Sequence, residues 1–140
     1  MSDLPQSDRL DGFPHPKDTE HLIGHEAAEA RFLDNFQSGR FHHAWLITGA
    51  RGVGKATFAY RAAQFLLSAQ ASGGGGLFGP PQSLDVTPDD PALALIHAGS
   101  HPGLAVLKRE YDTKGKKFYT AIRVDDVRTL SPFFQLTASE

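Results

Sequence analysis

The apolar positions of the chain predict a helix, a buried strand and a second helix in succession. Apolar residues recur at helical spacing from 25 to 37, and Gly39 stands where such a helix would end. Residues 44–48 are almost entirely apolar, as in a central parallel strand covered on both faces. Over 55–69 apolar residues again recur around much of a helix. This order predicts an α/β fold in which helices flank a parallel central sheet.

Further along, the pattern predicts one short helix and a second strand. Asp90 and Pro91 suit the N-cap and the first position of a helix, which would stop near Gly99. The apolar residues 104–107 are typical of a strand.

The last part of the chain predicts a hairpin and a final helix. Residues 109–112 and 116–120 are expected to pair around a turn at 113–115. Asp125 is expected to cap the helix that follows. Pro132 would bend that helix or lie near its first turn, because proline lacks a backbone N–H.

Two segments lack any such pattern. Residues 1–20 hold three prolines and several acids, so they are expected to form a flexible N-terminal arm. Residues 71–89 are rich in glycine and proline and are expected to form a flexible insertion, since a loop of roughly twenty residues is long for a compact domain. The domain itself is expected over residues 21–140.

Composition narrows the class of protein. The 140 residues carry a net charge of −2, so no global charge marks a nucleic-acid or membrane protein. There are no cysteines, which excludes disulfides and thiolate metal sites and fits a reducing cytoplasm. No apolar run approaches the length of about 20 residues that a membrane span needs. We therefore expect a cytoplasmic protein without a membrane partner.

The stretch Gly49-Ala50-Arg51-Gly52-Val53-Gly54-Lys55 carries the clearest chemistry. It lies between the predicted strand and the second helix, as a phosphate-binding loop does. Glycines let successive backbone N–H groups point at phosphate oxygens, and the helix that follows presents its positive end. Lys55 would reach the β- and γ-phosphates. The expected site residues in this stretch are Gly49, Arg51, Gly52, Val53, Gly54 and Lys55, followed by Ala56 and Thr57.

One position departs from the usual pattern. The motif places a hydroxyl after the lysine to coordinate magnesium, and this chain has Ala56 there. Thr57 follows one residue later, about 100° further around the helix, so it is not expected to substitute.

Other stretches carry weaker candidates. Residues 124–126 are similar to an acidic box that orders magnesium, but Arg123 interrupts the apolar run before it, which favours a helix cap. The basic and aromatic residues of 108–119 suit a DNA backbone, or a solvated hairpin whose charged edge discourages sheet pairing. Overall neutrality favours the solvated hairpin. The seven histidines show no metal-ligand spacing, so no metal site is expected.

Five separated blocks together carry a family resemblance. They are residues 22–25, 39–46, 49–55, 100–104 and 122–128. They are similar to the N-terminal part of clamp-loader subunits of the AAA+ family, with the delta-prime type of bacterial DNA polymerase III as the nearest likeness. The resemblance implies a P-loop NTPase (AAA+) domain truncated on its C-terminal side, because the family's acidic magnesium box and trans-acting arginine would lie beyond Glu140.

The resemblance also implies a role in DNA replication. A clamp loader is a hetero-oligomeric ring of subunits that loads the sliding clamp onto primed DNA, which this chain would contact only indirectly. Leu22 and Ile23 would line an adenine pocket beside the loop, and ATP or ADP would bind with weak or no magnesium. Delta-prime subunits usually act as a rigid stator with an imperfect site, and Ala56 departs in the same sense. The family's zinc-module cysteines are missing from 72–85, so no zinc is expected.

Two alternatives stay open. One is an active ATPase motor subunit of the same loader, which needs an acidic box further along the chain. The other is a small P-loop kinase, which needs a complete magnesium site and a substrate lid. Ala56 argues against the kinase, whereas the glycine-rich stretch 73–81 keeps it open.

Overall fold

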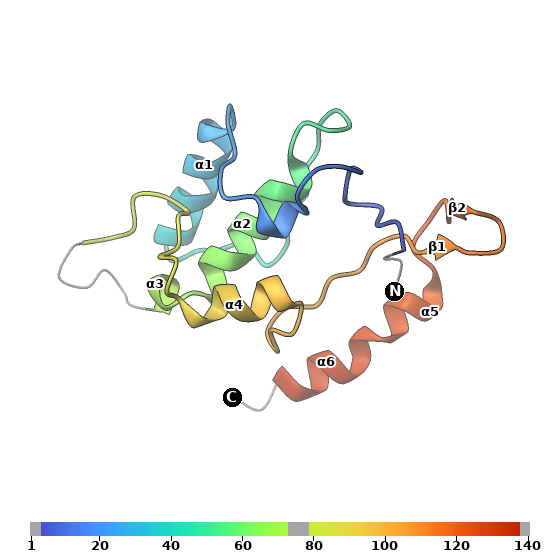
Figure 1. Cartoon of the computed structure of the whole chain (residues 1–140). Helices are drawn as coiled ribbons and strands as arrows, with labels where there is room; N and C mark the ends of the chain where they lie inside the picture. The colour runs from blue at the N-terminus through green and yellow to red at the C-terminus, as the bar shows by residue number, and fades with distance from the viewer. Residues whose placement is uncertain (1–3, 73–78, 138–140) are drawn as a thin grey trace. The chain divides into compact units, whose positions relative to one another are not determined.

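The computed structural model describes residues 4–72 and 79–137, which fall into two compact units. One unit spans residues 16–101, and the described residues of the other are 4–15 and 102–137. Figure 1 traces the elements from the N-terminus in blue to the C-terminus in red. Their order is η1 (Pro16–Asp18), α1 (Glu26–Gln37), α2 (Lys55–Leu67), α3 (Ala69–Ser72), α4 (Pro91–Ala98), β1 (Tyr111–Asp112), β2 (Lys117–Phe118), α5 (Val124–Arg128) and α6 (Leu130–Thr137).

Both ends of helix α1 are set by local interactions. The carbonyl of His25 accepts hydrogen bonds from the backbone N–H groups of Ala28 and Glu29, each 3.0 Å long, and so starts the helix. Beyond its end, Gly39 has a φ of 69°, which glycine adopts without strain. The helix predicted over 25–37 is confirmed.

Helix α2 ends two residues earlier than its apolar pattern predicts. The hydroxyl and the backbone N–H of Ser68 both donate to the carbonyl of Phe65, over 2.7 and 3.2 Å. A serine hydroxyl competes in this way with the helical hydrogen bonds of the backbone. The chain therefore turns after Leu67 and continues as the short helix α3.

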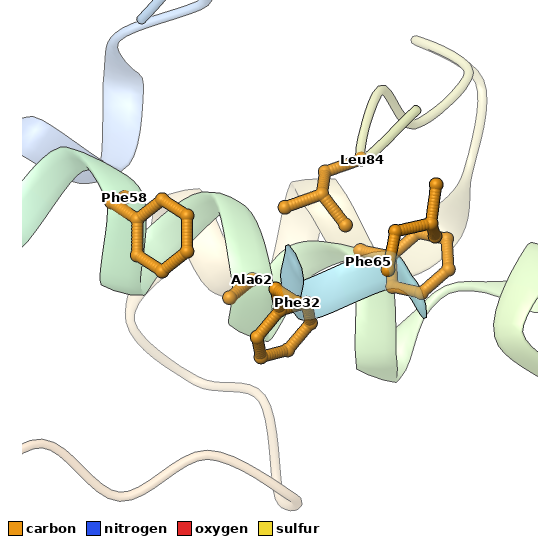
Figure 2. Close-up of a cluster of buried hydrophobic side chains, with 6 residues drawn as sticks. Phe32, Phe58, Ala62, Phe65 and Leu84 are labelled. Atoms are coloured by element: carbon orange, nitrogen blue, oxygen red, sulfur yellow. The ribbon is translucent and has the colours of Figure 1, made fainter. Parts of the chain in front are cut away.

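The core of the 16–101 unit lies between α1 and α2. Aromatic rings meet across the two helices, with centroids 6.0 Å apart for Phe32 and Phe58 and 5.0 Å apart for Phe36 and Phe65. Burying a large apolar side chain contributes about 1.5–3 kcal/mol, so this cluster is the main stabilising contact between the helices. Figure 2 shows the cluster, which consists of Phe32, Leu33, Phe58, Ala62, Phe65 and Leu84.

Helix α4 forms as its flanking residues predict. An Asp90 side-chain oxygen accepts a hydrogen bond from the backbone N–H of Ala92 over 2.9 Å, and Pro91 occupies the first turn. At the other end Gly99 has a φ of 70° and donates its N–H to the carbonyl of Ile96. The predicted start and end of this helix are confirmed.

Parts of the two segments expected to be flexible belong to the 16–101 unit and pack within it. Residues 73–78 of the predicted insertion lie outside the described residues, but Leu84 is only 1% exposed and sits in the core. In the predicted N-terminal arm, the Lys17 ammonium donates to the His97 carbonyl over 2.6 Å. Its own carbonyl accepts a hydrogen bond from the Gln64 side chain over 2.9 Å.

The strands predicted at 44–48 and 104–107 are not formed within the described residues. There the one sheet is the two-stranded pair of β1 and β2. Trp45 instead packs its ring against Phe32, with centroids 5.0 Å apart, and Leu46 is 89% exposed. The local predictions are wrong because a strand needs a hydrogen-bonded partner, which the described residues do not supply. The parallel central sheet of a P-loop fold stays a prediction.

The other unit contains the predicted hairpin. Strands β1 and β2 pair antiparallel, with Tyr111 opposite Phe118 and Asp112 opposite Lys117. The turn is closed by the Asp112 side chain, which accepts a hydrogen bond from the backbone N–H of Lys114 over 3.0 Å. The hairpin is confirmed.

Helices α5 and α6 replace the single last helix expected from the sequence. Asp126, not Asp125, satisfies the start of α5, because its side chain accepts the backbone N–H of Arg123 over 2.9 Å. The prediction that Asp125 caps this helix is therefore wrong, because Arg123 is the N-cap and Asp125 lies within the helix. Pro132 lies in the first turn of α6, where a missing N–H costs no helical hydrogen bond, as expected.

Candidate functional site

The loop before α2 takes a conformation that its glycines permit. Gly52 and Gly54 have φ values of 80° and 103°, in the left-handed region that favours glycine. The Val53 N–H donates to the carbonyl of Ala50 over 3.4 Å, which closes a turn within the loop. A methyl group added at Gly54 would also lie 2.8 Å from the Cδ1 atom of Leu22, so this position requires glycine twice over.

The Lys55 side chain folds back over this loop. Its ammonium donates hydrogen bonds to the carbonyls of Gly49 and Ala50, over 2.9 and 2.6 Å. The first turn of α2 contains no acidic residue, so no carboxylate there neutralises the positive end of the helix. The ammonium and the helix end thus concentrate positive charge where an anion would meet both.

The two residues after Lys55 lie in the first turn of α2 and are both partly buried. Ala56 offers no oxygen atom at the position where the loop motif places a magnesium ligand. Among the described residues, no three His, Cys, Asp or Glu side chains gather closely enough to hold a metal ion. The residue after Lys55 thus supplies no side-chain oxygen for a magnesium ion.

Of the two residues expected to line an adenine pocket, the structure brings only Leu22 to the loop. Its side chain lies against Gly54 and packs against the hydrophobic core. Ile23 is 87% exposed. Arg51 is also exposed, and its side chain makes no hydrogen bond or ion pair within the described part of the chain.

His25 is a loop contact that reasoning from the residues did not single out. Its Nε2 atom lies 2.6 Å from the carbonyl oxygen of Val53, so this nitrogen donates. A Cβ at Gly54 would lie 3.7 Å from the same nitrogen. The histidine thus joins the start of α1 to the loop. In the sequence it is marked only as the first residue of a predicted helix and the last of the block 22–25, because the contact spans 28 positions.

Arg61 anchors the segment that carries Leu22. The guanidinium is part-buried, and its Nη1 donates to the carbonyl of Glu20 over 2.9 Å. It also pairs with Glu29 of α1 over 2.7 Å and with Asp85 over 2.8 Å. Burial disfavours its charge, but the bonds to the two carboxylates prevail and raise the pKa of Arg61. This buried arginine was not predicted as part of the site.

The chain was searched for membrane-spanning helices and compared with known proteins and protein families. No helix in the described part is long and apolar enough to cross a membrane. No solved structure matches the chain. A segment of 44 residues, 31% of this chain, is 41% identical to the DNA polymerase III subunit gamma of Buchnera aphidicola subsp. Schizaphis graminum (strain Sg) and spans 12% of that protein. The model of the family described as "DNA polymerase III, delta subunit" matches residues 24–140, and the chain belongs to this family.

Proposed function

We propose that this chain is a clamp-loader subunit of DNA polymerase III, of the delta-prime type, which acts in the cytoplasm. In this role it assembles with other clamp-loader subunits in a ring that loads the sliding clamp onto primed DNA. Its loop at 49–55 holds the phosphates of ATP or ADP but supports little or no hydrolysis. The membership of the family supports the replication role.

One observation carries the nucleotide part of this proposal, namely the position of the Lys55 ammonium over the loop. A lysine at the start of a helix is electrostatically unfavourable, because the helix dipole is positive there. Two carbonyls of the loop hold the ammonium in place. Phosphate oxygens that replace these neutral carbonyls gain a charge-assisted bond and the positive helix end together.

The proposed lack of ATP hydrolysis follows from Ala56, which has no hydroxyl group. A magnesium ion at a phosphate loop is held by the hydroxyl that follows the lysine, and it neutralises charge that develops during phosphoryl transfer. Without that oxygen the loop binds phosphate through Lys55 and backbone N–H groups alone. Such a site suits a subunit that retains nucleotide for structural reasons.

Isothermal titration of the chain with ATP, with and without magnesium, tests this proposal. We expect weak binding that magnesium does not strengthen, and negligible turnover. Lys55→Gln removes a charged hydrogen bond of about 1.5–3 kcal/mol, so affinity should fall roughly tenfold to a hundredfold. Arg31→Gln, at an exposed position of α1, is the matched control and should leave affinity unchanged.

A gain-of-function variant sharpens the test. Ala56→Ser adds the missing hydroxyl, so ATP binding should become tighter when magnesium is present. If the wild-type chain already binds tightly and only with magnesium, the proposal of a degenerate site is wrong. If ATP does not bind at all, or Lys55→Gln has no effect, the loop is not a phosphate site.

A second candidate is an active ATPase subunit of the same loader. The likeness of 44 residues to a protein named subunit gamma supports it. In contrast to the first candidate, it requires ATP turnover that depends on magnesium. Measuring phosphate release by the chain within its assembled complex separates the two.

A further inference from the structure

His25 stands at the N-cap of α1, but its side chain does not cap that helix. Serine, threonine, aspartate and asparagine are favoured at an N-cap, because their side-chain oxygens accept free backbone N–H groups. The main chain of His25 is nevertheless fixed, since its carbonyl accepts hydrogen bonds from the N–H groups of Ala28 and Glu29. The ring is therefore carried on a fixed support and serves a contact outside the helix.

That contact is with the loop at 49–55. The Nε2 atom of His25 donates to the carbonyl of Val53 over 2.6 Å. The residues before His25 are held as well. Leu22 packs against the hydrophobic core, and the Gly24 N–H donates to the Glu26 carboxylate over 3.1 Å. The loop is thus bonded to a segment that is itself fixed.

The bond to Val53 also fixes the direction of the next N–H group. In a planar trans peptide, the carbonyl and the N–H that follows it point to opposite sides. Because the Val53 carbonyl faces His25, the N–H of Gly54 faces away from the histidine. Glycine has access to many backbone conformations, so Gly54 alone does not determine how this peptide is turned. The bond from His25 selects one orientation.

The Gly54 N–H is one of several at the start of α2 that can bind an anion. The first helical hydrogen bond of α2 runs from the N–H of Phe58 to the carbonyl of Gly54, over 2.9 Å. The N–H groups of residues 54–57 therefore have no helical partner. Such groups bind phosphate at helix starts, and they bind it better when they are oriented before the ligand arrives.

We infer that His25 is a positioning residue of the phosphate loop. Its Nε2–H holds the peptide between Val53 and Gly54 so that the Gly54 N–H is turned toward bound phosphate, while the histidine itself does not touch the nucleotide. The inference rests on the proposed function, because phosphate is the ligand of that site. The hold of His25 on the loop exists without any ligand and can be measured by itself.

Two substitutions separate the donor from the ring. His25→Phe keeps an aromatic ring but removes the N–H. His25→Gln removes the ring but places an amide donor, also Nε2, the same number of bonds from Cβ. His43→Phe makes the first change at an exposed histidine and is the control.

NMR of the full chain without nucleotide measures the hold on the loop. The order parameter of the Gly54 N–H should lie near the value of about 0.85 for rigid backbone, and His25→Phe should lower it below about 0.6. His25→Gln should restore it, and His43→Phe should leave it unchanged. The nitrogen chemical shifts of the neutral His25 ring should show the proton on Nε2. A proton on Nδ1 instead overturns the inference in the wild-type chain, even if a variant fails to fold.

Titrations with ATP and with inorganic tripolyphosphate measure the effect on binding. His25→Phe should weaken both by the same factor, roughly twofold to tenfold for the loss of one neutral hydrogen bond. His25→Gln should restore both affinities. Tripolyphosphate has no base, so a loss for ATP alone shows a contact with adenine and overturns the inference.

Two other results would also overturn it. One is an unchanged order parameter in His25→Phe, and the other is a His25→Gln variant that behaves like His25→Phe. If the wild-type chain binds neither ATP nor tripolyphosphate, the proposed function is wrong and the role toward phosphate is wrong with it. The order parameters distinguish these cases, because they report the hold of His25 on the loop whether or not a ligand binds.

Discussion

At the scale of single residues, the loop before α2 depends on contacts that are close and specific. Gly54 lies against Leu22, and the carbonyl of Val53 lies against the His25 ring. Lys55 is turned back on its own loop. These contacts place the segment before α1 directly beside the loop. A substitution in that segment should therefore affect the conformation of the loop.

Two glycines of the loop offer a matched pair of substitutions. Gly52→Ala meets only the strain of a left-handed conformation, about 1–2 kcal/mol, because no atom lies within 4 Å of its added Cβ. Gly54→Ala meets the same strain and also a Cβ contact of 2.8 Å with Leu22. Urea unfolding should therefore show a larger loss of stability for Gly54→Ala. Equal losses would mean that Leu22 does not pack against the loop.

At the scale of elements, helix ends are set by one or two side chains. Asp90 is 7% exposed and accepts hydrogen bonds from the backbone N–H groups of Ala92 and Ala69, both 2.9 Å long. It therefore caps α4 and also holds the start of α3. Ser68 ends α2 in a similar way, through its bonds to Phe65.

Removal of this cap should be costly. Asp90→Ala loses an N-cap worth about 1–2 kcal/mol, and the N–H of Ala69 loses its partner as well. The free energy of unfolding, measured with urea, should fall by at least the cap contribution. Asp89→Ala, at the exposed neighbouring position, should change it little. A similar effect for both variants would contradict the capping role.

At the scale of the whole molecule, each of the two units contains ion pairs and hydrogen bonds that join residues far apart in the sequence. In the 16–101 unit, Arg61 connects α2 to Glu20, Glu29 and Asp85. In the other unit, Asp8 pairs with Lys108 over 3.0 Å and thus joins residues 100 positions apart. Because these ion pairs involve carboxylates, they make the stability of each unit depend on pH.

The pair of Arg61 and Asp85 predicts a stability that falls in acid. The hydrogen bond from Arg61 lowers the pKa of Asp85 below its ordinary 3.8, because it favours the carboxylate. A lowered pKa in the folded state contributes stability above pH 3.8, and this contribution is lost as pH falls through the folded pKa. Asp85→Asn should thus be less stable than the wild type at neutral pH, and the difference should shrink in acid.

Urea unfolding at several pH values measures this difference. Asp34→Asn changes an exposed carboxylate of α1 in the same unit and is the control. A difference between Asp85→Asn and the wild type that stays constant down to strongly acidic pH would show that the ion pair does not contribute.

Much of the local structure and part of the candidate site could be predicted from the residues. Helices α1, α2 and α4, with the caps at Asp90 and Gly99, follow from apolar spacing and from side chains within one turn. The hairpin follows from alternation around a turn. The loop at 49–55 and the missing hydroxyl at Ala56 can likewise be predicted from the sequence, because each depends on neighbouring residues in the chain.

Only the tertiary structure decided which distant residues meet. It placed His25 and Leu22 against the loop, buried Leu84 in the core and surrounded Arg61 with its acidic partners. It also gave 44–48 no strand partners among the described residues, although the apolar pattern there favours a strand. The physical reason is the same in each case. Apolar spacing and caps act over a few residues, whereas burial, buried ion pairs and strand pairing require partners that only the folded chain brings together.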